Sequence, residues 1–225
     1  MDLTQALEKS IMQMFASRKP FDVENMARIL ATVDSARFFI DEMPLAHNFV
    51  QKTPLMDACL KQAQLDGLIL EFGVFKGTSI THIAKQVQCP VYGFDSFEGL
   101  PEDWTHFQRK GRFSLEGNLP PVPPNVELFK GWFDDSLPPF LADHPGDARL
   151  IHIDCDIYSS TKTVLTELTP RIKSGTVIVF DEYFNYPGWQ KHEHKAFMEF
   201  IEATGHEFEY IGFASSHFAV GVKIL

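Results

Sequence analysis

The segment LILEFGVFKGTSI, residues 68–80, is an apolar run that breaks into an acid, two glycines and two hydroxyl side chains. An apolar strand that ends in glycines just before a helical pattern is typical of the first turn of an open α/β sheet. Glycine lets the backbone pass close to a ligand, and hydroxyl groups add hydrogen-bond donors. Because such sheets bind ligands at the carboxyl edge of their parallel strands, the segment predicts a binding site there.

Short apolar segments alternate with helical or loop stretches from residue 67 onward, which predicts a parallel sheet with helices on both faces. The strand-like segments are LILEFGV, VYGFD, VELFKG, RLIHIDCD and TVIVFDEY. The last two apolar runs, EFEYIGFA and HFAVGVKIL, are separated by only a few residues, which leaves no room for a crossover helix. We therefore expect an α/β fold with a mostly parallel, seven-stranded sheet that ends in an antiparallel hairpin.

Apolar side chains at helical spacing characterise the part of the chain before the sheet. One helix is expected over residues 2–17 and a second over residues 22–43, and a proline follows each of them. A third helix is expected to begin with Thr53 as its N-cap and Pro54 at its first position. We accordingly divide the chain into an N-terminal helical segment, residues 1–62, which helps to cover the bound ligands, and a sheet domain, residues 63–225.

Composition and charge narrow the range of partners. The 225 residues fit one domain, and an apolar fraction of 44% with a charged fraction of 22% is that of a globular protein. No apolar run approaches the roughly 20 residues of a membrane helix, and the N-terminus lacks a secretory pattern. Three widely spaced cysteines indicate reduced thiols, and a net charge of -10 disfavours nucleic acid and anionic membranes. We expect a cytoplasmic protein that binds a small molecule.

The glycine turn has the spacing Glu71-x-Gly73-x-x-x-Gly77-x-Ser79. This spacing is neither the dinucleotide pattern G-x-G-x-x-G nor a P-loop, so nicotinamide and triphosphate sites are disfavoured. An acid two residues before the first glycine suits a ligand with a cationic amine and no pyrophosphate, such as the methionine part of S-adenosylmethionine. The alternative is a plain strand-to-helix turn that Thr78 or Ser79 caps.

Two further places along the sheet could complete the same site. Asp95 ends the second strand of the sheet, a position from which a carboxylate can bind both hydroxyls of a ribose. Trp132 and Phe133 follow the third strand and could cover an adenine face. Each observation has an ordinary alternative, because many strands end in Asp and both aromatic residues could belong to the core.

Acidic side chains gather at the ends of the next two strands. Alternation along the strand end puts Asp154 and Asp156 on one side, and Asp181 with Glu182 closes the following strand. Crowded carboxylates need a counter-charge or raised pKa values, and oxygen ligands without Cys or His favour magnesium. The structural alternative is that these acids cap helices or pair with Arg171 and Lys173.

Four motifs together resemble the macrocin O-methyltransferase family, in consistent order over roughly residues 65–190. They are EFGVFKGTS (71–79), FDSFEGLP (94–101), IDCDIY (153–158) and FDEY (180–183). The resemblance implies a Rossmann-like class I methyltransferase that uses magnesium and methylates sugar hydroxyls of antibiotics. The family often has two Asp where this chain has Asp181 and Glu182, so the role of Glu182 as a direct ligand is the least secure.

The resemblance also implies the roles of individual residues. Asp156 is expected to be the general base, and Asp154, Asp181 and Glu182 are expected to hold Mg²⁺. Asp95 is expected to bind the ribose of the cofactor S-adenosylmethionine. The whole set of expected cofactor-binding residues is Glu71, Gly73, Gly77, Thr78, Ser79, Asp95, Ser96, Trp132, Phe133 and Asp154.

The predicted function is the metal-assisted O-methylation of a sugar or vicinal-diol hydroxyl on a small molecule. A homodimer is considered as the assembly state. The alternatives are a magnesium-dependent phosphatase, which the Asp154-x-Asp156 pattern also fits, and a non-catalytic S-adenosylmethionine-binding protein. Residues 101–125, with five prolines, are expected to form a lid. His192 and His194 are expected on an exposed helix face beside Glu193, and His152 is expected to be a hydrogen-bonded strand histidine.

Overall fold

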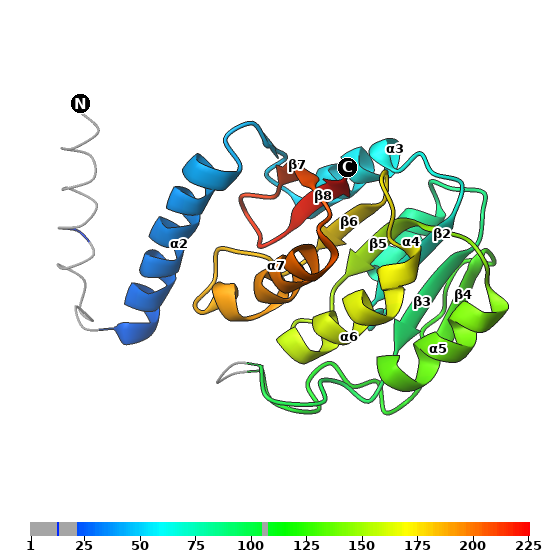
Figure 1. The fold of residues 1–225 in the computed structure, drawn as a ribbon. Helices are drawn as coiled ribbons and strands as arrows, with labels where there is room; N and C mark the ends of the chain where they lie inside the picture. The colour runs from blue at the N-terminus through cyan, green and yellow to red at the C-terminus, as the bar shows by residue number, and fades with distance from the viewer. Residues whose placement is uncertain (1–12, 14–21, 105–107) are drawn as a thin grey trace.

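The computed structural model of this chain describes residue 13, residues 22–104 and residues 108–225 (Figure 1). Apart from Gln13, the helix expected over residues 2–17 lies outside the described residues. The described helices are α2 (Val23–Glu42), α3 (Lys52–Gln62), α4 (Thr78–Ala84), α5 (Phe133–Asp143), α6 (Tyr158–Leu168), α7 (Glu193–Thr204) and the short 3₁₀ turns η1 (Thr169–Arg171) and η2 (Trp189–Lys191). The described strands are β1 (His47–Asn48), β2 (Leu68–Phe72), β3 (Val91–Asp95), β4 (Val126–Lys130), β5 (Ala148–Ile153), β6 (Val177–Phe180), β7 (Phe208–Phe213) and β8 (Val220–Ile224).

The strands form one sheet in the order β1-β7-β8-β6-β5-β2-β3-β4. All pairs are parallel except those of β8, which runs antiparallel to β6 and to β7. The mostly parallel sheet with a terminal antiparallel hairpin is therefore confirmed. The described sheet has eight strands instead of the expected seven, because His47 and Asn48 pair with the free edge of β7. A two-residue strand is too short to produce an alternating pattern.

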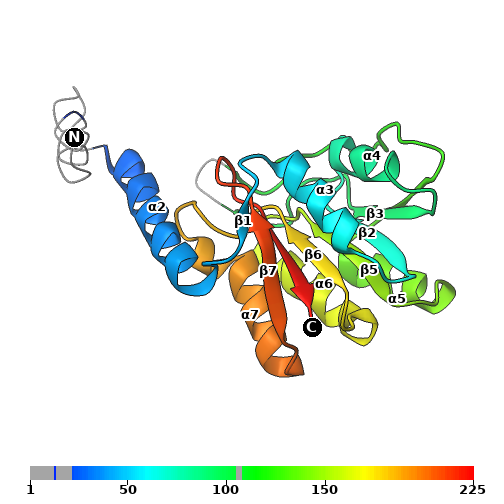
Figure 2. The same ribbon diagram turned by 90° about the horizontal axis from the view of Figure 1, so that it is seen from above.

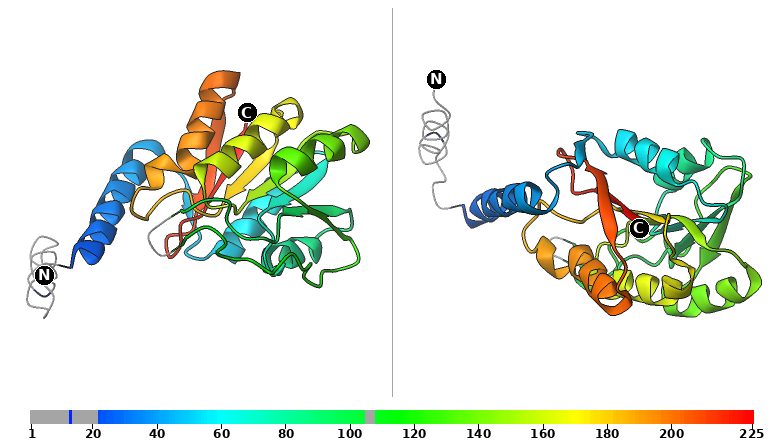
Figure 3. Two further views of the ribbon diagram at one scale, coloured as in Figure 1. Left: turned by 90° about the horizontal axis from the view of Figure 1, so that it is seen from below. Right: turned by 45° about the horizontal axis from the view of Figure 1, so that its top comes forward.

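Helices cover both faces of the sheet, as the views in Figures 2 and 3 show. Helices α3 and α4 lie on one face, and α5, α6 and α7 lie on the other. Each interface has its own apolar core, and β2 and β6 are buried along their whole length. Burial on both faces explains why these strands read as continuous apolar runs.

The N-terminal helices begin near their expected positions. Helix α2 is capped by Asp22, whose carboxylate accepts hydrogen bonds from the backbone N–H groups of Glu24 and Asn25. The expected N-cap of α3, Thr53, is wrong, because that helix already begins at Lys52. Helix α3 packs on β6, β7 and β8, whereas α2 extends away from the end of the sheet where β7 lies (Figure 1).

The structure bears on the state of the cysteines and on the presence of membrane-spanning helices. Its three cysteines are free thiols, of which Cys59 and Cys155 are buried. Across residues 22–104 and 108–225, no helix has both the length and the apolar character needed to cross a bilayer.

Candidate active site

Strand register brings the predicted site residues to one edge of the sheet. Phe72 of β2 lies opposite Ile153 of β5, and Ile153 lies opposite Phe180 of β6. The residues that follow these three positions are Gly73, Asp154 and Asp181, so they emerge side by side. Backbone hydrogen bonds continue the ladder past the strand ends, from Asp154 N to Phe72 O at 2.8 Å and from Asp181 N to Ile153 O at 2.9 Å.

Gly73 is required by this close approach of two strand ends. Its φ is +89°, and a Cβ added there would lie 1.7 Å from the carbonyl oxygen of Asp154. No larger residue fits at that distance. The glycine therefore makes room for the protein's own acidic loop, in addition to forming part of the cavity wall.

Asp95 at the end of β3 organises the glycine turn. Its Oδ2 accepts hydrogen bonds from the backbone N–H groups of Val74 (2.9 Å) and Phe75 (2.8 Å), and its Oδ1 accepts one from Phe97 (2.7 Å). A carboxylate has about four lone-pair sites, so capacity remains for ligand hydroxyl groups. Asp95 thus links the ends of β2 and β3 and also lines the cavity.

Glu71 lies behind the cavity wall. It is fully buried, and its two oxygens accept hydrogen bonds from Ser79 Oγ (2.9 Å) and His152 Nδ1 (2.8 Å). Gly77 is the left-handed N-cap of α4, and Thr78 is the first residue of that helix. The cavity lining does not include Glu71, Gly77, Thr78 or Ser79. These residues can therefore affect cofactor binding only through the shape of the turn.

A cavity of about 590 Å³ opens at this sheet edge. Trp132 is 40% exposed and free to stack on a ligand, whereas the Phe133 ring packs edge-on against Phe72 at 5.5 Å between centroids. Eight of the predicted site residues line the cavity, namely Gly73, Asp95, Ser96, Trp132, Phe133, Asp154, Asp156 and Glu182.

Three of the lining residues form a compact carboxylate cluster. Asp154, Asp156 and Glu182 each offer an oxygen within 4.8 Å of the others. Asp154 and Asp156 meet as predicted, but the cause is different, because β5 ends at Ile153 and strand alternation does not reach them. Asp156 has a φ of +64° at the centre of a tight turn in which Ile157 N donates to Cys155 O at 2.7 Å. Such turns are rare and strained, and strained residues gather at functional sites.

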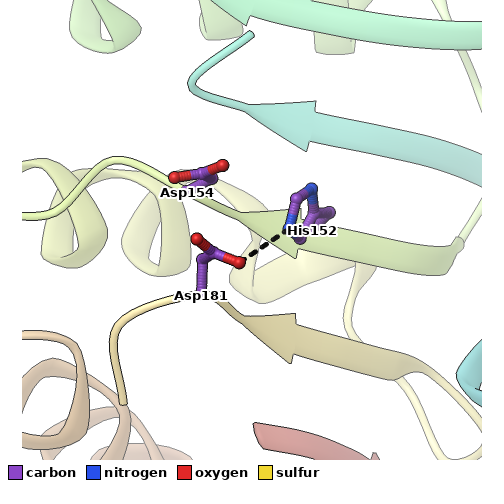
Figure 4. Close-up of side chains that lie close together, drawn as sticks. All are labelled: His152, Asp154 and Asp181. Atoms are coloured by element: carbon purple, nitrogen blue, oxygen red, sulfur yellow. Dashed lines mark ion pairs between the residues drawn. The ribbon is translucent and has the colours of Figure 1, made fainter. Parts of the chain in front are cut away.

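Asp181 lies next to this cluster but between two cations. Its Oδ1 is 4.0 Å from His152 Nε2, an ion pair that Figure 4 marks, and its Oδ2 accepts a hydrogen bond from Lys52 Nζ. The structural alternative of pairing with Arg171 is wrong, because that guanidinium donates to the carbonyls of Gly146 and Leu141. Asp181 itself does not line the cavity.

Burial shifts the pKa values of the cluster. Desolvation, followed by repulsion from Asp181, raises the pKa of Asp156 to about 7 and raises those of Asp154 and Glu182 well above their usual range. Burial also opposes the charge of His152. The hydrogen bond and charge of Glu71 outweigh that effect and raise the pKa of His152 to about 9, so the imidazole is charged at neutral pH.

The donor set fits a hard divalent cation. The donors of the cluster of Asp154, Asp156 and Glu182 are carboxylate oxygens, which suit magnesium better than softer metals. Within the described residues, Oε2 of Glu182 is buried and has no hydrogen-bond partner. A buried, unpartnered carboxylate oxygen beside two other acids is unfavourable unless a cation compensates it.

Sequence patterns missed the contacts that three ionisable residues make in this region. His152 was expected to be hydrogen-bonded, which is confirmed, but its link to both Glu71 and Asp181 was not foreseen. Lys52 lies on α3, outside the strand ends where site residues were sought. The expectation of an exposed face at residues 192–194 is wrong, because Glu193 is fully buried and its Oε2 accepts a hydrogen bond from Glu182 N at 2.9 Å. His194 packs its ring among aromatic side chains.

The segment expected to form a lid borders the cavity. Pro101, Trp104 and Phe113 contribute to the lining. Ser159 Oγ of α6 donates a hydrogen bond of 2.7 Å to Glu102, and the Trp104 ring lies 5.7 Å from that of Tyr186. These contacts join the first part of the segment to the far side of the cavity.

Comparison with known proteins identifies the family to which this chain belongs. A family model described as "Methyltransferase domain" matches residues 70–183, which is half of the chain. The match includes the glycine turn, Asp95 and the whole carboxylate cluster. The macrocin family is not itself named by the comparison.

Curated relatives are O-methyltransferases. The chain is 27% identical over 168 residues, which cover 62% of this chain and 63% of the relative, to 8-demethyl-8-(2,3-dimethoxy-alpha-L-rhamnosyl)-tetracenomycin-C 4'-O-methyltransferase of Streptomyces olivaceus. It is 34% identical over 145 residues, 54% of each chain, to demethyldecarbamoylnovobiocin O-methyltransferase of Streptomyces niveus. The chain thus spans less than two thirds of these relatives' length.

Solved structures share the fold. The calicheamicin methyltransferase CalS11 superposes with a TM-score of 0.62 at 20% identity, covering 92% of this chain and 93% of that chain. The O-methyltransferase NovP superposes with a TM-score of 0.56 at 22% identity, covering 79% and 82%. These likenesses confirm the predicted Rossmann-like methyltransferase fold.

Proposed function

This chain belongs to the methyltransferase domain family, and we propose that it transfers a methyl group from S-adenosylmethionine to a sugar or vicinal-diol hydroxyl of a small natural product, with the help of a divalent cation. The observation that carries the proposal is the carboxylate cluster of Asp154, Asp156 and Glu182 in the wall of the cavity that Asp95 and Gly73 also line. The relatives are O-methyltransferases of sugars or natural products, which supports the acceptor class.

The cofactor half of the site is the side formed by the glycine turn. Asp95 would accept hydrogen bonds from the ribose hydroxyls, while the hydrogen bonds that it accepts from backbone N–H groups keep the turn in place. Ser96 follows Asp95 in the cavity lining, and the exposed Trp132 indole would cover the adenine. Glu71 and Ser79 stabilise the turn from behind through their mutual hydrogen bond.

The acceptor half is the side formed by the acids. S-adenosylmethionine, when bound, supplies an electrophilic methyl group, and a magnesium ion held by Asp154, Glu182 and Asp181 would favour ionisation of the acceptor hydroxyl. Asp156 accepts the proton of that hydroxyl, because its carboxylate lines the cavity within the same cluster as Asp154 and Glu182. The apolar lid residues exclude water from the cavity.

Titration calorimetry tests the proposal against the two alternatives. We expect stoichiometric binding of both S-adenosylmethionine and Mg²⁺, and a several-fold or greater loss of cofactor affinity in Asp95→Ala. A phosphatase binds the metal alone, and family membership removes the basis for that alternative. A non-catalytic binding protein takes up the cofactor without methylating any acceptor. Unchanged cofactor affinity in Asp95→Ala would place the cofactor elsewhere.

Simple measurements test the predicted cellular location and the predicted assembly state. The chain is expected to work in the cytoplasm, which fractionation of the source cells tests. A homodimer is expected as the assembly state, and light scattering of the purified protein determines the mass in solution.

A further inference from the structure

Lys52 is a charged residue of the acidic region that neither the sequence motifs nor the family match includes. Its ammonium group donates to Asp181 Oδ2, although 129 positions separate the two residues. Its charge also acts on Glu182 and Asp154. One lysine therefore pairs directly with Asp181 and adds a positive charge near the other two residues proposed to hold the metal.

The fold fixes the point from which Lys52 reaches the cluster. Lys52 is the first residue of α3, and the helix is anchored against the sheet by the buried side chains of Leu55, Cys59 and Leu60. The lysine side chain is 39% exposed, whereas that of Asp181 is 9% exposed. The Lys52 side chain therefore borders solvent, whereas that of Asp181 is largely shielded from it.

The approach of Lys52 is also separate from the ligand cavity. Asp154, Asp156 and Glu182 line the cavity, but Lys52 and Asp181 do not. Lys52 thus reaches the cluster from the α3 face of the sheet and does not occupy the space of a cofactor or acceptor. A role in holding either of those molecules does not fit this position.

We propose that Lys52 is a positioning residue that competes with the divalent cation for Asp181 and so sets the affinity of the metal site. When the cation is absent, the ammonium group supplies the positive charge that the buried acids require. When the cation binds, it takes over Asp181, and Lys52 turns to solvent. The inference rests on the proposed metal-assisted function.

The test measures metal binding in the absence of cofactor and acceptor. Mg²⁺ is titrated by calorimetry into the unmodified protein, Lys52→Met and Lys52→Arg. We expect Lys52→Met to bind Mg²⁺ at least about tenfold more tightly, because a positive charge within a few ångströms of the site is removed. Lys52→Arg keeps the charge and should stay within about threefold of the unmodified protein. Lys61→Met removes a charge from the same helix at an exposed position and serves as the matched control.

Thermal unfolding provides the second measurement. Lys52→Met should melt at a lower temperature than the unmodified protein without metal, and saturating Mg²⁺ should raise its melting temperature more. Equal or weaker Mg²⁺ affinity in Lys52→Met overturns the inference while leaving the proposed function in place. If neither the unmodified protein nor any variant binds Mg²⁺, the metal-assisted function itself is contradicted, and the inference is contradicted with it.

Discussion

Asp154 and Asp156 lie two positions apart in one loop, yet their surroundings differ. Asp154 belongs to both sets of clustered ligand atoms, one with His152 and Asp181 and one with Asp156 and Glu182. Asp156 belongs to the second set alone and has a left-handed backbone that returns its side chain to the cluster. At the scale of single residues, Asp154 is therefore central to the cation site, since the two sets share it, whereas Asp156 shares only its own set with Glu182.

This difference predicts unlike effects of two conservative substitutions. Asp154→Asn removes an anionic ligand, so it should raise the Mg²⁺ concentration needed for half activity, and excess Mg²⁺ should partly restore the rate. Asp156→Asn should leave Mg²⁺ affinity nearly unchanged and lower kcat by roughly 10²- to 10⁴-fold, the usual range for a lost general base. Steady-state methyl transfer at several Mg²⁺ concentrations measures both. If excess Mg²⁺ rescues Asp156→Asn, that residue is a ligand and not the base.

The acids could be predicted from sequence because Asp154 and Asp181 directly follow apolar strands and Asp156 and Glu182 lie just beyond them. Lys52 could not, because a lysine at a helix start gives no local sign of a partner 129 positions away. Glu193 misled the prediction for a related reason. It stands among polar neighbours in KHEHK, and its burial depends on how the loop after β6 folds back onto α7.

At the scale of elements, contacts of its described residues join the lid segment to the walls of the cavity. Leu100 and Arg112 are joined by a backbone hydrogen bond of 2.9 Å, and Glu102 is tied to Ser159 of α6. Arg109, Lys110 and Arg112 are exposed cleavage points for trypsin.

Trypsin should therefore cut near Arg109 to Arg112 in the free protein, and cofactor together with acceptor should suppress the cut. Mass spectrometry of timed digests identifies the sites. Ser159→Ala removes the tie to Glu102 and should be cut faster than the unmodified protein. Equal cutting with and without ligands would count against a lid.

Helix α2 is attached to the rest of the chain through an aromatic cluster. The ring of Phe38 contacts those of Trp189 and His194 at 5.2 Å, and Ser35 Oγ accepts a hydrogen bond from Asn185 N at 2.8 Å. Burial lowers the pKa of His194 to about 4, so the imidazole is neutral in the folded protein.

That shift predicts a dependence of stability on pH. The unfolded chain protonates His194 below its ordinary pKa of about 6.5, while the folded protein resists protonation until about pH 4. Stability should therefore fall as pH falls through this window, by at most about 2 kcal/mol between pH 7 and pH 5. His194→Phe should show a smaller loss in urea unfolding at the two pH values. His47→Phe, at an exposed position, controls for the loss of one histidine, and equal losses in all three proteins contradict the assignment.

The order of elements was predictable, whereas their exact ends were not. The alternation of apolar segments with helical stretches predicted the five parallel strands and the hairpin, since each segment is long enough to stand out as an apolar run. The start of α3 was misplaced because its N-cap, Gln51, makes no side-chain capping hydrogen bond and so leaves no sequence signal.

At the scale of the whole molecule, the sheet order explains why distant residues share one site. Strands β5, β2 and β3 are neighbours in the sheet, and β6 adjoins β5. The glycine turn, the ribose-binding acid and the carboxylate cluster therefore meet at adjacent strand ends. Periodicity predicts a parallel sheet but not which strands are adjacent, so the distances within the site could be obtained only from the folded chain.

The most direct test of metal-assisted O-methylation is methyl transfer from labelled S-adenosylmethionine to a panel of vicinal-diol sugars, glycosylated natural products and catechol. Each acceptor is assayed with Mg²⁺ titrated and with excess chelator. We predict transfer to a hydroxyl of at least one sugar acceptor, saturable in Mg²⁺ and abolished by the chelator. Methyl transfer that continues at full rate in the chelator would contradict the role given to the carboxylate cluster.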